Sequence, residues 1–390
     1  MITRTPNAIL CWTRRCLVSS RTRRGFAVTS VLALLVGSGL FGRAVRFVRT
    51  SGRRTLRFCR DLRNVGQAQI AIRNKRWYLP SLFAHYTVNS VCNLRCSYCY
   101  VGQPEIFPEG FTNQGLPIDR AKRVLATLRE ECLFLRILGG EPLLYGDVNE
   151  LVRYAKKDLR YWHVSIITNG LLLARQPERY EPLLENLDLL TISLDRTRAT
   201  QYPKQIQHLE AFLPELAALC RRHSVDLTGN YTATWAELDE PAEMQALIDR
   251  WRPHFAGTYV TPVRLAGKTP LPLLKAAVDL NRRYSLGRYT RPEYPAVENV
   301  EWYREYCDPK LKIKVDAAGG LVYPCENHSY TAGSLEEHSI RALWSKELVR
   351  YPNESCIGCG KQRFRSEAFK SPVAIAGLAR NLARSRRVAT

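Results

Sequence analysis

The sequence predicts an α/β fold, a partial (β/α)6 TIM-type barrel over residues 83–265. Short apolar runs alternate there with amphipathic segments, and polar or cysteine-containing motifs follow several of the runs. This alternation is typical of parallel strands joined by crossover helices. The expected strands are 84–88, 133–138, 163–168, 187–193, 226–231 and 258–263, and the expected helices lie near 119–131, 146–157, 177–186, 204–223 and 239–252.

Positive charge is concentrated at the two ends of the chain. The formal net charge of +22 divides into +16 for residues 1–82, +7 for residues 361–390 and about −1 for the remainder. Basic arms attract the phosphates of anionic lipids or of RNA, although they can also serve only solubility and topology. We expect a membrane surface as the partner, and not nucleic acid. The basic tail, residues 363–390, fits either a second membrane-surface helix or a solvated one.

An N-terminal hydrophobic and basic helical extension is expected over residues 1–82. Within it, residues 25–45 begin with 18 uncharged residues, which is at the short end for a spanning helix. Three interpretations stay open for this segment: a membrane anchor, a cleaved signal with a twin-arginine-like start, and a plain hydrophobic extension. Arginines on both sides of it leave the orientation undetermined. Residues 45–77 have the composition of a basic helix on an anionic surface.

Seven of the twelve cysteines fall in tight, metal-type clusters, which indicates a reducing compartment and not a disulfide scaffold. Cys92, Cys96 and Cys99 form a C-x3-C-x2-C loop directly after the first expected strand. Such a loop can present three thiolates to a 4Fe–4S cluster. The fourth iron is then open to a further molecule, as the free position of a catalytic zinc is. A zinc site or a four-cysteine cluster is the alternative, but no fourth cysteine follows before Cys132.

Polar motifs end the next strands, where the chemistry of barrels gathers. They are Gly139-Gly140-Glu141-Pro142 after the second strand, Thr168-Asn169-Gly170 after the third, Ser193 and Asp195 after the fourth, and Asn230 near the end of the fifth. Each one alone also fits a simple turn or cap.

The cysteine loop and the GGE motif together resemble the radical SAM superfamily, whose pattern is C-x3-C-x-aromatic-C with Tyr98 as the aromatic residue. The resemblance implies that S-adenosylmethionine (SAM) chelates the open iron. One electron then cleaves a carbon–sulfur bond of SAM and gives a 5′-deoxyadenosyl radical. It further implies SAM contacts for a set of residues. Tyr98 would lie near the adenine, the backbone of Gly139, Gly140 and Glu141 at the methionine amino group, and Ser193, Asp195 and, more weakly, Asn230 at the ribose or carboxylate.

A second cysteine set comprises Cys307, Cys325, Cys356 and Cys359. A hairpin is expected between its members, with strands 312–316 and 321–323, followed by a turn and short helix over 333–344. The set resembles the twitch domain, a shortened SPASM domain, which implies a second 4Fe–4S cluster over residues 301–362. Residues 266–300 would connect it to the barrel. The alternative is a four-cysteine zinc ribbon.

Three functions follow as hypotheses. The preferred one is a membrane-associated radical SAM enzyme that acts on a lipid or membrane-bound precursor, with a cytoplasmic catalytic domain held at the membrane through residues 25–45. The second is a radical SAM enzyme that modifies peptides or oxidises small molecules. The third is a non-catalytic iron–sulfur or zinc protein of assembly or regulation. The resemblance also implies an electron donor such as flavodoxin or ferredoxin. The substrate and the catalytic acid or base stay undetermined.

Overall fold

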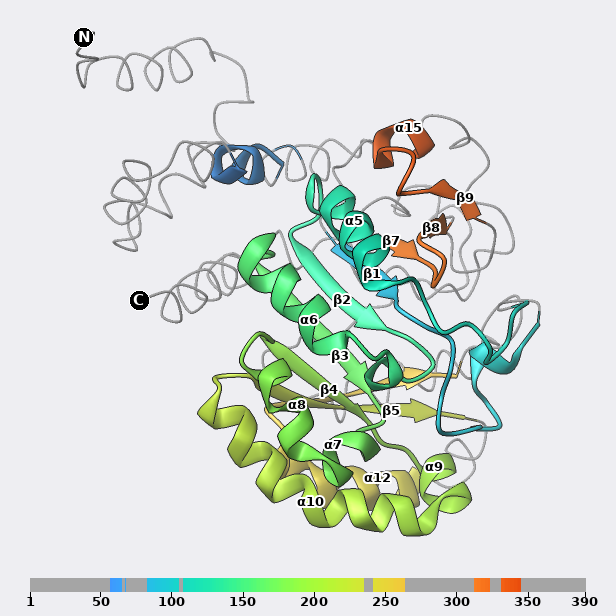
Figure 1. Cartoon of the computed structure of the whole chain (residues 1–390). Coiled ribbons are helices and arrows are strands. Elements are labelled where there is room, and N and C mark those ends of the chain that lie inside the picture. The colour runs from blue at the N-terminus through green and yellow to red at the C-terminus, as the bar shows by residue number, and fades with distance from the viewer. Residues whose placement is uncertain are drawn as a thin grey trace, which may run out of the picture. The chain divides into compact units, whose positions relative to one another are not determined.

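The computed structural model describes residues 57–64, 67, 83–104, 108–234, 241–263, 312–322 and 331–344 (Figure 1). The chain divides into two compact units, Met1–Pro80 with Phe369–Thr390 and Ser81–Ala368. In the first unit, residues 57–64 are helical, inside the segment expected to form a basic helix. The second unit contains the strands and the motifs.

Six neighbouring parallel strands form the wall of a partial barrel, as the sequence predicts. In chain order they are β1 (Phe83–Thr87), β2 (Phe134–Leu138), β3 (His163–Thr168), β4 (Leu189–Ser193), β5 (Asp226–Ala233) and β6 (Gly257–Pro262). Their order in the sheet follows their order in the chain, and every neighbouring pair is parallel. The strand ends differ from the expected ones by at most two residues, and those of β3 agree at both ends.

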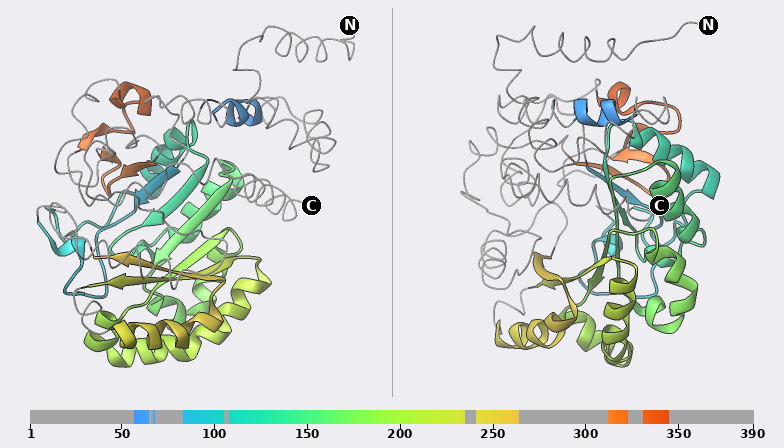
Figure 2. Two further views of the ribbon diagram at one scale, coloured as in Figure 1. Left: turned by 180° about the vertical axis from the view of Figure 1, so that it is seen from behind. Right: turned by 90° about the vertical axis from the view of Figure 1, so that its left-hand side faces the viewer.

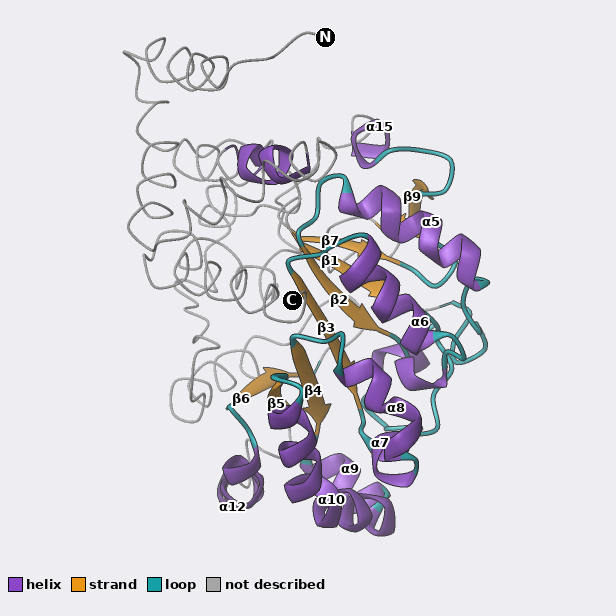
Figure 3. Cartoon of the chain, turned by 60° about the vertical axis from the view of Figure 1, so that its left-hand side comes forward, coloured by secondary structure: helices purple, strands orange, loops and turns teal. Residues whose placement is uncertain are grey.

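Helices cover one face of this sheet (Figure 3). They are α5 (Ile118–Arg129), α6 (Val148–Arg153), α7 (Leu171–Arg175), α8 (Pro177–Leu184), α9 (Arg196–Gln201), α10 (Pro203–Arg222) and α12 (Pro241–Trp251). Apolar residues at helical spacing explain the packing: Val124, Leu125 and Leu128 on α5 are fully buried. Figure 2 places α10 and α12 at the β5–β6 end of the sheet, away from α5.

Alternate residues of β1 and β2 are buried, so these strands have one face against the helices and one face turned inward. Ala84 and Tyr86 on β1 belong to the apolar core, while His85 between them is half-buried on the opposite face. The alternation of buried and half-buried residues therefore identifies which residues of β1 and β2 face inward.

The sheet continues past β1 with strands from the C-terminal part of the chain. β7 (Lys312–Val315) pairs parallel with β1, and β8 (Gly320–Val322) and β9 (Thr331–Ser334) follow as antiparallel neighbours. The predicted hairpin is confirmed by the antiparallel pairing of β7 with β8. In its turn, Asp316 Oδ1 accepts hydrogen bonds from the N–H groups of Ala318 and Gly320. The predicted short helix is present as α15 (Ile340–Trp344). The pairing of β7 with β1 was not predicted.

Candidate active site

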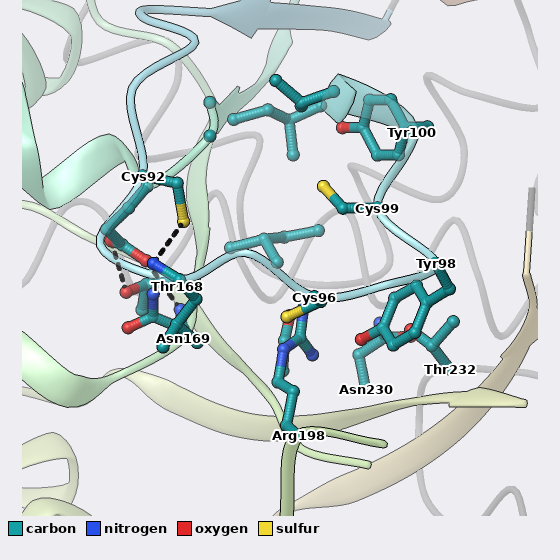
Figure 4. A pocket seen from close by; sticks show the side chains of 18 of the residues that line it. Cys92, Cys96, Tyr98, Cys99, Tyr100, Thr168, Asn169, Arg198, Asn230 and Thr232 are labelled. Atoms are coloured by element: carbon teal, nitrogen blue, oxygen red, sulfur yellow. Dashed lines mark hydrogen bonds between the residues drawn. The ribbon is translucent and has the colours of Figure 1, made fainter. Parts of the chain in front are cut away.

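The three cysteines of the first motif line one cavity at the C-terminal ends of the barrel strands (Figure 4). The cavity has a volume of about 240 Å³. Its wall includes Cys92, Cys96, Tyr98, Cys99, Leu138, Gly139, Gly140, Glu141, Ile167, Asn169, Ser193, Arg198, Asn230, Thr232 and Thr261. The topology explains the convergence, because parallel strands bring the loops that follow them to the same edge.

The cysteine loop supplies the donor set that a cluster requires. The three thiols are free and partly exposed to the cavity, and burial raises the pKa of the Cys92 thiol to about 11. Binding to iron would therefore release protons from these thiols. Within the described ranges, no three His, Cys, Asp or Glu side chains converge closely enough to hold a single ion. A 4Fe–4S cluster is larger than a single ion, so its thiolate ligands lie further apart than the ligands of one ion. The three thiols line the same cavity.

The GGE motif is joined to the residues just before Cys92 through backbone hydrogen bonds. Gly140 N donates to Asn89 O at 3.1 Å, and Glu141 N donates to Val91 O at 2.7 Å. A Cβ atom on Gly140 would collide with the carbonyl oxygens of Ser90 and Val91. Glycine is thus required here for close approach to the chain's own backbone, a reason that differs from the approach to a ligand expected from the sequence.

The Glu141 carboxylate connects the ends of β2 and β3. It is buried and accepts hydrogen bonds from Leu143 N at 3.0 Å, Thr168 Oγ1 at 2.7 Å and Asn169 N at 2.8 Å. The side chain of Asn169 in turn donates to Asn93 Oδ1 in the cysteine loop at 2.8 Å. The motifs after β1, β2 and β3 therefore form one hydrogen-bonded unit.

Asp195 does not line the cavity, although the sequence selected it as a SAM contact. Its carboxylate is fully buried and caps α9 by accepting from Arg198 N at 2.9 Å. It also accepts from the Tyr98 hydroxyl at 2.5 Å and from Arg198 Nη1 at 2.7 Å. Asp195 thus orients two cavity residues and carries the capping role that was the alternative expectation.

Arg198 is a charged residue of the cavity wall that was not predicted from the sequence. Its guanidinium lies by Cys96 and 5.6 Å from the centre of the Tyr98 ring. Burial raises the pKa of the Cys96 thiol, and the Arg198 charge opposes this rise. Nε of Arg198 is buried without a hydrogen-bond partner. An unpartnered buried donor beside a cavity fits an anionic ligand group. The signal in the sequence was the Asp-x-x-Arg spacing at the start of a helix.

Side chains of Gln201, the last residue of α9, and Tyr202, the next residue, form hydrogen bonds with the cysteine loop. The hydroxyl of Tyr202 accepts from Arg95 N at 2.6 Å, and Gln201 Oε1 accepts from Ser97 N at 3.2 Å. These contacts satisfy two N–H groups of the loop, which is otherwise irregular.

Ser193 and Asn230, both expected from the sequence, lie in the cavity wall. Asn230 Oδ1 accepts from Thr261 Oγ1 at 3.0 Å, and Thr232 completes this polar side on β5 and β6. Thr232 and Thr261 were not expected, because a threonine in a strand is ordinarily a structural residue.

The auxiliary cysteines Cys307, Cys325, Cys356 and Cys359 lie outside the described residues, as do residues 25–45. In the part of the chain that the structure describes, no helix combines the length and apolarity needed to cross a membrane.

Residues 86–228 match the family model of the Radical SAM superfamily. GTP 3′,8-cyclase of Lactiplantibacillus plantarum is 38% identical over 135 residues, which cover 31% of this chain and 36% of that protein. The S-adenosylmethionine-dependent nucleotide dehydratase RSAD2 of Oncorhynchus mykiss is 36% identical over 115 residues, 28% of this chain and 30% of that protein. The chain thus spans about a third of the length of these curated relatives.

Solved structures share the fold at low sequence identity. Histidine-tagged anSMEcpe with bound AdoMet has a TM-score of 0.51 and 15% identity, covering 79% of this chain and 99% of that one. Streptococcus suis SuiB bound to its precursor peptide SuiA has a TM-score of 0.50 and 17% identity, covering 86% and 83%.

Proposed function

Residues 86–228 match the Radical SAM family model, and from this match we propose that the protein cleaves SAM reductively in the cavity lined by Cys92, Cys96 and Cys99. The three thiolates would hold a 4Fe–4S cluster with one iron left open. When bound, that cluster supplies the electron that breaks a carbon–sulfur bond of SAM. The observation that carries the proposal is the presence of three thiols, the GGE backbone and a partly buried arginine in the wall of one cavity.

The protein's own residues would bind and orient SAM. Arg198 would form a charge-assisted hydrogen bond with the methionine carboxylate through its unpartnered Nε. The backbone at Gly139 and Gly140, fixed by Asn89 and Val91, would receive the methionine amino group. Tyr98 would lie against the adenine, with its hydroxyl restrained by Asp195. Ser193 and Asn230 offer a hydroxyl and an amide to the ribose.

An auxiliary 4Fe–4S cluster held by Cys307, Cys325, Cys356 and Cys359 is a further part of the proposal. The support for it is the spacing of the four cysteines around the β7–β8 hairpin. Fully ligated by protein, it would take an electron from a substrate radical or hold this part of the chain together. A zinc ion at the same four thiolates is the competing assignment.

The substrate and the location are proposals from the sequence alone. Residues 25–45 and the basic arms support a cytoplasmic enzyme at the membrane surface that acts on a lipid or membrane-bound precursor. A flavodoxin or ferredoxin would supply the electron. The second candidate, a small-molecule enzyme, is favoured by the names of the relatives, a GTP cyclase and a nucleotide dehydratase.

The decisive experiment is anaerobic reconstitution of the full chain with iron and sulfide, followed by dithionite and SAM. We expect about eight irons per chain and formation of 5′-deoxyadenosine. A C96A variant should lose about four irons and all cleavage, whereas C220A, which changes a buried cysteine remote from the cavity wall, should keep both. Four irons with one zinc would contradict the auxiliary cluster. Full iron loading without cleavage of SAM would contradict the proposed activity.

Membrane association is tested separately by fractionating cells that express the full chain or a chain lacking residues 1–82. The proposal expects the full chain with the membranes and the shortened chain in the supernatant. A full chain found entirely in the supernatant would contradict it.

A further inference from the structure

The inner face of the barrel carries a row of basic residues below the SAM cavity. Leu138 on β2 and Ile167 on β3 line the cavity, which identifies the face of these strands that turns inward. Residues two positions away on a strand share a face. Arg136 and Ser165 therefore lie on the same inner face, one layer further from the cavity mouth and about 7 Å along the strands.

Strand register extends this layer across the sheet. Arg136 is paired with Ser165 on β3 and with His85 on β1, and His85 is paired with Lys314 on β7. Neighbouring strands are about 4.8 Å apart, so Lys314, His85 and Arg136 stand side by side on adjacent strands. All three side chains are half-buried. The acidic residue of the same row, Asp226, lies on β5, three strands from Arg136.

Arg136 has no anionic partner among the residues that the structure describes. Its Nε donates to the neutral hydroxyl of Ser165 at 3.4 Å, and that hydroxyl donates to Leu135 O at 3.2 Å. A guanidinium offers five donors in a planar fork, and one long bond to a hydroxyl uses few of them. Packing does not require such a side chain on the inner face of a barrel, because apolar residues fill that position on other strands, as Leu189 does in the same row.

We propose that the row formed by Lys314, His85 and Arg136 binds a phosphate group of the substrate. This inference rests on the proposed function and deepens it, since it assigns the substrate to the class of phosphate esters. The charges of Lys314 and Arg136 match the multiple charge of a phosphate or diphosphate, His85 between them offers a ring N–H, and the arginine fork matches the phosphate oxygens. A phosphate held here would place the rest of the substrate toward Leu138 and Ile167, at the floor of the SAM cavity. Lys314 comes from β7, so the C-terminal hairpin would supply part of the binding surface.

The test compares R136Q, R136K and the control K157Q in the full-length, cluster-loaded protein with saturating SAM. Lys157 is exposed and lies near the end of the helical segment after α6, so K157Q removes one positive charge elsewhere. The probes are tripolyphosphate, the four ribonucleoside triphosphates, and dihexanoyl phosphatidic acid below its micellar concentration. Binding is measured by calorimetry at two salt concentrations.

We expect at least one probe to bind, with affinity about tenfold lower in R136Q, partly restored in R136K and unchanged in K157Q. Preference for a triphosphate identifies a soluble nucleotide as the source of the phosphate, and preference for phosphatidic acid identifies a lipid. Absence of binding by all probes, or equal binding by wild type and R136Q, would overturn the proposal. If R136Q loses its cluster, H85Q replaces it in the same comparison.

Formation of 5′-deoxyadenosine without substrate separates this inference from the proposed function. R136Q should retain that uncoupled cleavage, because Arg136 is not part of the cavity wall. A protein that cleaves SAM but binds no phosphate probe would contradict only the phosphate row. A protein that binds the probes through Arg136 and never cleaves SAM would contradict the proposed function.

Discussion

The hydroxyl of Tyr98 donates a 2.5 Å hydrogen bond to Oδ2 of Asp195, a carboxylate with no exposed surface. The two residues are 97 positions apart, and the bond fixes the aromatic ring of the cysteine loop to the start of α9. Because the same carboxylate also accepts from Arg198, one buried anion orients both an aromatic and a cationic residue of the cavity wall. The arrangement of the site therefore depends on a residue that does not line the cavity.

Replacing Tyr98 with Phe should weaken this restraint without removing the ring. The variant loses one hydrogen bond to a charged acceptor, so we expect a fall of about 1–2 kcal/mol in the free energy of unfolding and a higher KM for SAM. Urea unfolding of the apo protein and initial rates measure the two effects. The control is Tyr154→Phe, since the Tyr154 hydroxyl makes no hydrogen bond among the described residues and its ring contacts Lys122. Equal effects of both substitutions would contradict the assigned role.

The two roles of Arg198 can be separated by a double substitution. Arg198→Gln alone leaves the buried Asp195 charge poorly compensated and should cost about 3 kcal/mol of stability, together with loss of SAM binding. Adding Asp195→Asn removes the uncompensated charge and should restore most of the stability. SAM binding should stay lost, because the guanidinium for the carboxylate is still missing. Recovery of SAM binding in the double variant would assign Arg198 a structural role only.

Gly140→Ala tests the close packing between the GGE motif and the cysteine loop. The new methyl group would collide with the carbonyl oxygens of Ser90 and Val91, so we expect a loss of about 1–3 kcal/mol and poorer retention of iron. Gly146→Ala is the matched control, because a Cβ there meets nothing within 4 Å. Thermal unfolding and iron content distinguish the two. Similar stability of both variants would show that the loop yields to the added methyl group.

We expect the free energy of unfolding to decrease in mild acid because of His163. Burial lowers the pKa of His163 below its ordinary value of 6.5, and its Nδ1 is buried without a partner. Below pH 6.5 the unfolded chain therefore binds a proton that the folded chain resists, and stability decreases as the pH falls, by up to about 1.4 kcal/mol per pH unit. Urea unfolding at pH 7.5, 6.5 and 5.5 should give a shallower decline for His163→Phe. The exposed His338 offers the control, and His338→Gln should retain the wild-type decline.

The strands were predictable from sequence because their signal is local. The run 163–168 contains three large apolar residues and is separated from its neighbours by amphipathic segments, and β3 begins and ends at the predicted residues. β5 begins at the predicted residue and continues two residues further. Helices α7 and α9 were missed, since five or six residues are too few to give a helical period. The sequence of Lys312–Val315 alone does not indicate that this strand pairs with β1. The pairing depends on which edge of the sheet the preceding strands leave unpaired.

The site was predictable where a motif has a fixed local geometry. Cys92, Cys96 and Cys99 share one loop, and their common cavity follows from that. The capping role of Asp195 was an alternative expectation, but its contact with Tyr98 was not predictable, because it joins residues 97 positions apart. Arg198 was missed for the same reason, and the Arg136–His85–Lys314 row becomes visible only when strand register aligns three distant segments.

The parallel pairing of β1 with β7 also bears on how the protein is made. β7 leaves the ribosome long after β1, on the order of 10–50 s later at ordinary elongation speeds. During this interval one side of β1 lacks its hydrogen-bonding neighbour and is a template for association with other nascent chains. The cysteine loop is attached directly to that strand. Until β7 has been translated and paired, the strand that leads into the cysteine loop therefore keeps an open edge.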